Sequence, residues 1–155
     1  MALEIERKFL ITDSSWKSTS DQGIFIKQGY LVSEVDKVVR IRVHGEKGIL
    51  TIKGSTVGMT RTEYEYEIPL ADAFELLALC GDNVIEKTRY GIDFAGNTWE
   101  IDVFQGRNKG LEVAEVELVS EDQKVDLPTW VGKEVTHDPR YYNACLIDAP
   151  FDTWD

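Results

Sequence analysis

The sequence predicts a mainly β protein: an antiparallel sheet of eight strands, open or closed into a barrel, with a few flanking helices. The main observation is that apolar and polar residues alternate with a period of two along most of the chain, which is typical of strands. Helical periodicity is confined to short segments. The 155 residues, 43% of them hydrophobic, suit a single domain over 1–155 with a sizeable core.

Eight segments carry the strand pattern, and several of their connections are short. Residues 44–48 contain two glycines and link two strands as a hairpin, and Gly96-Asn97 marks another turn. Residues 53–56 are expected to form a Gly/Ser loop between strands. Short connections favour antiparallel neighbours. The expected strands are 3–11, 25–33, 37–43, 49–53, 60–68, 84–93, 97–104 and 110–119.

Three segments are expected to be helical. In residues 70–80, apolar positions recur at steps of three and four, which gives one apolar stripe. Ser120 and Gln123 have the spacing of a capping box for a short helix over 121–126. An Asp138-Pro139 pair resembles an N-cap followed by proline at the first helical position, and predicts a helix running through Leu146.

The charge balance narrows the class of function. Asp and Glu number 28 against 17 Lys and Arg, a formal net charge of −11, so the overall field repels nucleic acid and anionic membranes. No apolar run reaches the roughly 20 residues of a membrane span. The first ten residues carry charges where a signal peptide is apolar, so we expect a cytoplasmic protein. Cys80 and Cys145 are expected to be buried thiols, and His44 and His137 to lie at the surface.

Same-sign charges recur two residues apart in strand after strand. Same-face neighbours on a strand lie about 7 Å apart, so each pair repels itself modestly. One such pair suits a solvated face. A whole set favours guest ions of opposite charge, a divalent cation for the carboxylates and a polyphosphate for the basic residues. The pairs are Glu4/Glu6, Arg40/Arg42, Glu63/Glu65, Lys87/Arg89, Glu100/Asp102 and Glu115/Glu117.

The apolar residues on the opposite face of these strands need cover. Tyr64, Tyr66, Ile101 and Val116 are examples, and we expect the helices at 70–80 and after Asp138 to cover this face from outside. The charged face then points into a closed barrel. Only a hydrated lumen tolerates that arrangement, because buried unpaired charges are very costly.

The order of these motifs resembles a known family. Residues 4–8, EIERK, are similar to the ExExK signature of the CYTH superfamily, the triphosphate tunnel metalloenzymes. The resemblance spans residues 2–146 and is greatest to short bacterial members with inorganic tripolyphosphatase activity. The other matching segments are 28–31 (QGYL), 40–42 (RIR), 51–53 (TIK), 61–65 (RTEYE), 86–90 (EKTRY), 99–104 (WEIDVF), 115–117 (EVE), 132–136 (GKEVT) and 140–143 (RYYN).

The resemblance implies a closed eight-stranded antiparallel barrel that forms a tunnel. Basic side chains inside it would bind triphosphate, and acidic ones would hold Mg²⁺ or Mn²⁺. Glu63 and Glu65 would orient water or the basic residues, and Glu100 would support the site from behind. The implied phosphate ligands are Lys8, Arg40, Arg42, Lys53, Lys87 and Arg89, with Arg61 and Lys133 as weaker candidates. The implied metal ligands are Glu4, Glu6, Asp102, Glu115 and Glu117.

The chemistry of these residues suits phosphoryl transfer to water, which depends mainly on positioning and charge stabilisation. A tripolyphosphate carries roughly −4 to −5 at neutral pH, which six cations and a divalent metal can match. Lys87 is the first candidate for a general base, since neighbouring cations would lower its pKa; it can equally remain charged and bind phosphate. Tyr30 is the second candidate, against the alternative of a packed strand aromatic.

Two other classes of function stay open. Some relatives in the resembled family are class IV type adenylate cyclases or act on thiamine or nucleoside triphosphates, and no dedicated base pocket is visible in this sequence. A non-catalytic polyphosphate-binding module would keep every cation and dispense with the carboxylates, all of which are present here. The expected partner is a small-molecule triphosphate. An antiparallel barrel can pair as a homodimer, although no interface signature stands out.

Overall fold

The computed structural model describes residues 3–154 and contains nine strands and two α-helices within that range. The strands are β1 (Leu3–Ile11), β2 (Ile24–Ser33), β3 (Val38–His44), β4 (Lys47–Val57), β5 (Thr60–Ile68), β6 (Val84–Phe94), β7 (Asn97–Phe104), β8 (Glu112–Glu117) and β9 (Val131–Glu134). The α-helices are α1 (Leu70–Leu79) and α2 (Asn143–Asp148). Short 3₁₀ turns are η1 (Ser15–Ser18), η2 (Gly106–Asn108), η3 (Pro139–Tyr141) and η4 (Phe151–Thr153).

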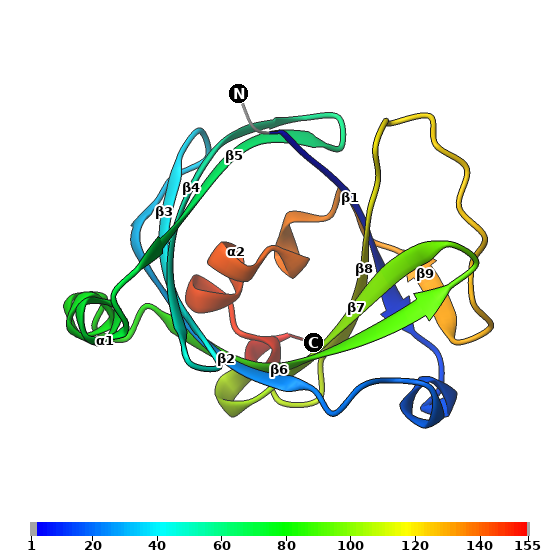
Figure 1. Cartoon of the computed structure of the whole chain (residues 1–155), viewed down its shortest axis with the longest axis horizontal. Coiled ribbons are helices and arrows are strands. Elements are labelled where there is room, and N and C mark those ends of the chain that lie inside the picture. Colours follow the sequence, from blue (N-terminus) through cyan, green and yellow to red (C-terminus); the bar gives the residue numbers. More distant parts are fainter. Residues whose placement is uncertain (1–2, 155) are drawn as a thin grey trace.

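The first eight strands close into an antiparallel barrel, as predicted (Figure 1). Their order is β5-β4-β3-β2-β6-β7-β8-β1, and pairing of β1 with β5 closes the ring through the register Glu4↔Arg61. Closure leaves each strand with one inner and one outer face. The single domain over 1–155 stays a prediction, although every described strand belongs to this one sheet.

Two features of the sheet differ from the sequence-based expectation. Residues 53–56 are not a loop, because β4 continues to Val57 and stays paired with β5 beyond a register shift between Lys53 and Thr56. The ninth strand was not predicted. It has four residues and pairs with the end of β1 beyond an irregularity, so it is too short to show a period of two.

The three expected helices fared differently. The helix at 70–80 is confirmed as α1, which ends at Leu79 with Cys80 as its C-cap, and the next residue, Gly81, has a φ of +60° that suits glycine. The helix at 121–126 is wrong, because Gln123 and Ser120 bond within a turn: the Val119 amide donates to Gln123 Oε1, and the Ser120 hydroxyl donates to Asp122.

The third expected helix is divided into two pieces. The Asp138 side chain accepts from the Arg140 amide, as expected of a cap, but it caps only the 3₁₀ turn η3. Tyr142 then adopts an extended backbone, with φ −72° and ψ 132°, and α2 begins at Asn143. The break changes the direction of the chain, so that α2 lies within the outline of the ring of strands when the barrel is seen end-on (Figure 1).

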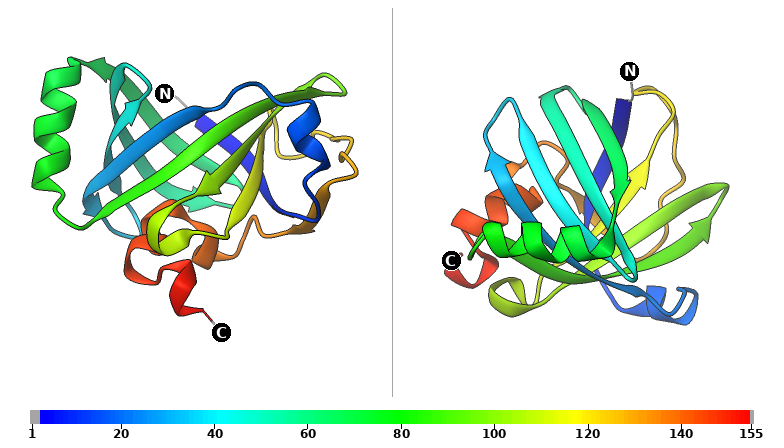
Figure 2. Two further views of the ribbon diagram at one scale, coloured as in Figure 1. Left: turned by 90° about the horizontal axis from the view of Figure 1, so that it is seen from below. Right: turned by 60° about the vertical axis from the view of Figure 1, so that its left-hand side comes forward.

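The expectation that two helices cover the outer face of the barrel is therefore only partly right. Outside the barrel, α1 packs Ala73 and Leu77 against Ile41 and Val43 (Figure 2). The largest outer cluster, which includes Ile101 and Val116, is covered by η1 and the segment after β8 rather than by a helix, through Trp16, Leu118 and Trp130. Tyr64 and Tyr66 stay exposed, at 36% and 55%.

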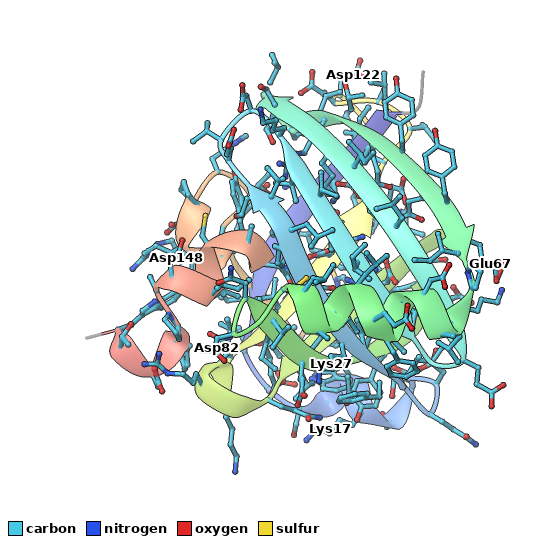
Figure 3. All side chains as sticks on the ribbon, turned by 90° about the vertical axis from the view of Figure 1, so that its left-hand side faces the viewer. Lys17, Lys27, Glu67, Asp82, Asp122 and Asp148 are labelled. Carbon is cyan, nitrogen blue, oxygen red and sulfur yellow. The ribbon has the colours of Figure 1, made fainter. Side chains whose placement is uncertain are left out.

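The structure also corrects the expected position of α2, which closes one end of the barrel instead of covering its outside. Leu146 is fully buried in a cluster with Tyr30, Ile85, Val113 and Tyr141. In Figure 3, Asp148 at the end of α2 and Glu67 near the end of β5 lie on opposite sides of the molecule. Within residues 3–154, no helix has the length and apolar character needed to cross a membrane.

Candidate active site

The barrel encloses a cavity of about 670 Å³ that is lined by side chains from most of its strands and from α2. This volume lies within the range of small-molecule sites. Because side chains alternate between faces, the same-sign pairs of β1, β3, β5, β6 and β8 point inward together. The expected residues that line it are Glu4, Glu6, Lys8, Tyr30, Arg40, Arg42, Lys53, Arg61, Glu63, Glu65, Lys87, Arg89, Glu100, Glu115 and Glu117.

Two expected residues are not among those lining the cavity. Lys133 lies exposed on β9, outside the closed ring. Its strand joins the sheet beyond the barrel, so its face could not be deduced from the alternation in the other strands. Asp102 is 1% exposed and lies behind two inward-pointing cations of the neighbouring strand β6.

Asp102 holds these two cations in place. Its Oδ2 accepts from Lys87 Nζ at 2.7 Å and from Arg89 Nη2 at 2.9 Å, while its Oδ1 accepts from Arg89 Nε at 2.7 Å. Burial opposes ionisation, but the positive charges of Arg89 and Lys87 outweigh it and lower the pKa of Asp102 to about 2. Both of its oxygens are therefore occupied within the protein.

The cations around Asp102 also repel one another. Burial, together with Arg89 and Arg42, lowers the pKa of Lys87 to about 7 despite the pull of Asp102. Burial and the neighbouring Arg40 and Arg89 also lower the pKa of Arg42 to about 9. A second negative partner in the cavity would relieve both effects, because it favours the charged form of each side chain.

Arg40 extends this cluster of cations along β3. Its Nη2 donates to Thr51 Oγ1 at 3.1 Å and lies 3.7 Å from Glu65 Oε2. Its buried Nε has no hydrogen-bond partner among the described residues. Such a group normally finds an acceptor, because leaving a charged donor unpaired is costly.

Carboxylates from β1 and β8 face each other beside this cluster, and Arg89 Nη2 lies 3.8 Å from Glu115 Oε2. Glu6 and Glu117 are cross-strand neighbours, and so are Lys8 and Glu115. Lys8 Nζ bridges the acids, 2.8 Å from Glu115 Oε1 and 3.3 Å from Glu6 Oε1. Burial opposes the charge of Lys8, but Glu115 and Glu6 outweigh it and raise its pKa.

The carboxylates differ in their electrostatic surroundings. Burial and the negative charge of Glu115 raise the pKa of Glu6. Burial, Glu4 and Glu6 raise the pKa of Glu117. By contrast, Lys8 and Arg89 overcome burial and hold the pKa of Glu115 well below its usual range. Two of these carboxylates thus lie in a place that disfavours their charge.

A smaller group lies where β1 and β4 approach β5. Lys53 Nζ is 2.8 Å from Glu4 Oε1 and 3.1 Å from Glu63 Oε2. Arg61 turns its Nε to the carbonyl of Gly54, at 2.7 Å. Each inward lysine or arginine of the cavity therefore begins with partners from the protein itself.

Several residues of the site were not predicted. Gln28 is fully buried, donates from Nε2 to Tyr30 Oη at 2.8 Å and accepts from Arg42 Nε at 2.9 Å. Asn143 accepts from Lys87 Nζ at 2.8 Å. His44, expected at the surface, is half-buried and lines the cavity. Gln28 and Asn143 lie in the matching segments 28–31 and 140–143, which was the available signal that they belong to the site. Neither segment shows the alternating charge that marked the other site residues.

The oxygen ligands present suit a hard divalent cation. Among residues 3–154 there is no group of three or more His, Cys, Asp or Glu arranged to hold a metal ion. Mg²⁺ commonly binds through one or two carboxylates together with substrate phosphates. Burial and neighbouring carboxylates raise the pKa values of Glu6 and Glu117, and a cation beside them would offset both effects. The donor chemistry therefore fits such an ion when it is shared with substrate oxygens.

Comparison with known proteins agrees with this arrangement. The model of the CYTH domain matches residues 2–142. The chain is 48% identical over 152 residues to an inorganic triphosphatase of Acetivibrio thermocellus, covering 97% of each protein, and 37% identical to one of Nitrosomonas europaea, covering 92% of this chain and 95% of the relative. A crystal structure of an inorganic triphosphatase superposes with a TM-score of 0.67 at 35% identity, covering 95% of each chain. This chain belongs to the CYTH domain family.

Proposed function

We propose that this protein is a metal-dependent triphosphatase that hydrolyses inorganic tripolyphosphate to pyrophosphate and phosphate. The observation that carries the proposal is the convergence of six cations from four strands on one cavity that also contains facing carboxylates. Similarity to inorganic triphosphatases over nearly the whole chain supports the same substrate. The six cations are Lys8, Arg40, Arg42, Lys53, Lys87 and Arg89.

These cations would bind the phosphate oxygens, with Arg61 as a further contact. The depressed pKa of Arg42 favours this role, because a bound anion restores its preference for the charged form. Arginine also binds phosphate through two parallel hydrogen bonds. We leave Lys133 out of this set, since it is exposed on β9.

Mg²⁺ or Mn²⁺ would be held by Glu4, Glu6, Glu115 and Glu117. When bound, the ion supplies positive charge to the phosphate oxygens and polarises a water molecule. We assign Asp102 to holding Lys87 and Arg89 instead, because both of its oxygens already accept from them. Lys8 and Lys53, which lie between the carboxylates, would turn to the phosphates when the cation takes their place.

We assign the general base to Lys87. With a pKa lowered to about 7, a substantial fraction of its amine is neutral at neutral pH. Water would give a proton to Lys87 Nζ while its oxygen forms a bond to the terminal phosphorus, and the bond from that phosphorus to the pyrophosphate oxygen breaks. Tyr30 is less suited, because its hydroxyl oxygen already accepts from Gln28.

The direct experiment is a phosphate-release assay with tripolyphosphate, pyrophosphate, ATP and thiamine triphosphate, each with Mg²⁺ or Mn²⁺. We expect tripolyphosphate to be cleaved fastest, and the chelator EDTA to abolish turnover. Arg42→Met should reduce kcat/KM by about 10²- to 10³-fold, in line with loss of a charge that stabilises phosphoryl transfer. Arg107→Met, which removes a surface arginine paired with Asp152, is the matched control and should be unchanged.

Other outcomes would replace the proposal. Cyclic AMP as the product from ATP would identify a cyclase, and preferred turnover of thiamine triphosphate would identify a different triphosphatase. Tight calorimetric binding of tripolyphosphate without a metal and without turnover would identify a binding module. A cytoplasmic location is expected from the sequence, which also allows a homodimer, and both stay predictions.

A further inference from the structure

The first residue of α2 joins three strands at the closed end of the cavity. Asn143 Oδ1 accepts from Lys87 Nζ of β6 at 2.8 Å and from Gln28 Nε2 of β2 at 3.3 Å. Gln28 Oε1 in turn accepts from Arg42 Nε of β3 at 2.9 Å. A single side-chain oxygen on a six-residue helix therefore connects two of the cations that face the cavity.

The orientation of each amide in this network follows from its neighbours. Arginine and lysine nitrogens only donate hydrogen bonds. Arg42 therefore requires the oxygen of Gln28, which leaves the NH₂ group of Gln28 to face Tyr30 and Asn143. Both Gln28 and Lys87 then require an acceptor from Asn143, so its oxygen rather than its nitrogen must point toward them.

The same bonds determine how the amine of Lys87 is oriented. A tetrahedral nitrogen has four positions, and in Lys87 one is the bond to Cε. Two more are directed at Asp102 Oδ2, at 2.7 Å, and at Asn143 Oδ1, at 2.8 Å. The fourth position, whether it carries a proton or a lone pair, has a single direction left, and Lys87 lines the cavity. With Asp102 alone, two positions would remain, and the lone pair of a neutral amine could occupy either of them.

The position of Asn143 is itself well determined. The extended backbone of Tyr142 turns the chain into α2, and Leu146, one turn after Asn143, is fully buried against Ile85 and Val113. Ile85 precedes Lys87 on the inner face of β6, so the packing of α2 and the hydrogen bond to Lys87 involve the same strand. The helix thus holds the acceptor rigidly against the base.

We propose that Asn143 is a positioning residue, which fixes the direction of the reactive position of Lys87 and couples it through Gln28 to Arg42. This inference rests on the proposed hydrolysis of tripolyphosphate. Asn143 acts on the orientation of the base and leaves the other phosphate-binding cations in place. Its removal should therefore lower the rate of the chemical step more than it weakens substrate binding.

The test compares Asn143→Ala with Ile147→Ala, which truncates an apolar side chain on the same helix that packs in the buried cluster. Steady-state kinetics with tripolyphosphate should show kcat of Asn143→Ala reduced about 10- to 100-fold with KM changed less than about 3-fold. Ile147→Ala should lower the midpoint of urea unfolding and leave kcat unchanged. Gln28→Leu should lower kcat and also raise KM, since it removes the acceptor for Arg42.

Each contrary result has one meaning. An unchanged kcat in Asn143→Ala, or a raised KM with unchanged kcat, would overturn the positioning role. An equal loss of kcat in Ile147→Ala would assign the effect to displacement of α2 and overturn it as well. Absence of turnover in the unmodified protein would instead contradict the proposed function, so the two failures are distinguishable.

Discussion

The cavity holds two neighbouring groups of charges, a basic side around Asp102 and an acidic side around Lys8, which meet where Arg89 Nη2 lies 3.8 Å from Glu115 Oε2. On the basic side, the cations Lys87 and Arg89 both pair with one carboxylate, Asp102. On the acidic side, the carboxylates Glu6 and Glu115 both pair with one cation, Lys8. The first group is drier, since Lys87 and Asp102 are each 1% exposed, whereas the side chain of Glu6 is 23% exposed. We therefore expect the central charge to matter more on the basic side, where water cannot substitute for it.

The two sides also differ in the sign of the charge that their ion pairs leave unbalanced. On the basic side, the excess is positive, and it lowers the pKa values of Lys87 and Arg42. On the acidic side, the excess is negative, and it raises those of Glu6 and Glu117. Each side is thus disposed to accept a guest of the opposite sign, at some cost to the stability of the empty protein.

The largest expected effect is that of removing the central acid. Asp102→Ala removes the buried carboxylate that both Lys87 and Arg89 contact and should destabilise the fold by about 3–5 kcal/mol, measured by urea unfolding at pH 7. The control Asp152→Ala breaks an exposed pair with Arg107 and should cost less than about 1 kcal/mol. Equal effects of the two substitutions would show that burial does not increase the cost of breaking an ion pair in this cluster.

Removal of Lys8, the central cation of the acidic side, should destabilise the fold less. Lys8→Met leaves Glu6 and Glu115 facing each other, but the partly exposed Glu6 keeps some solvation. We expect a loss of about 2–3 kcal/mol at pH 7, below the cost of breaking a fully buried pair. Lys8 lowers the pKa of both Glu6 and Glu115, so without it protonation relieves their repulsion at a higher pH, and the deficit should shrink as the pH falls toward 5. A deficit that grows on acidification would contradict this assignment.

A smaller effect of opposite sign is expected for Glu6→Gln. The folded-state pKa of Glu6 is raised, so its charge opposes folding at neutral pH and protonation relieves this as the pH falls through the folded-state pKa. The amide should therefore raise the urea midpoint slightly at pH 7, while phosphate release falls sharply. A lowered midpoint would show that the ion pair with Lys8 outweighs the repulsion from Glu115.

The smallest effect is expected outside the barrel. Arg7 on β1 and Glu134 on β9 form a pair with two hydrogen bonds, at 2.7 and 3.0 Å, whose side chains are 23% and 37% exposed. Arg7→Ala should lower stability by about 0.5 kcal/mol, as for surface pairs in general, and leave tripolyphosphate turnover unchanged. A tenfold loss of turnover would mean that β9 takes part in shaping the cavity.

The sequence accounts for most of the barrel because its signals are local. Alternation over nine or so residues identifies a strand and both of its faces, and the like-charged pairs mark the face that points inward. The first eight strands and the inward positions of Arg42, Lys87 and Glu115 follow from that pattern. The helix expected at 121–126 failed because Gln123 finds a partner within the turn, a competition that residue spacing does not reveal.

What the sequence determined by itself is therefore the charged inner face and the strands that bear it, since a period of two depends only on neighbours along the chain. Only the tertiary structure decided which charges meet. Register across β6 and β7 hides Asp102 behind Lys87, the short β9 carries Lys133 outside the ring, and the break at Tyr142 brings Asn143 to the base. These contacts join residues up to 56 positions apart, and the way the ring closes, not any local preference, sets such distances.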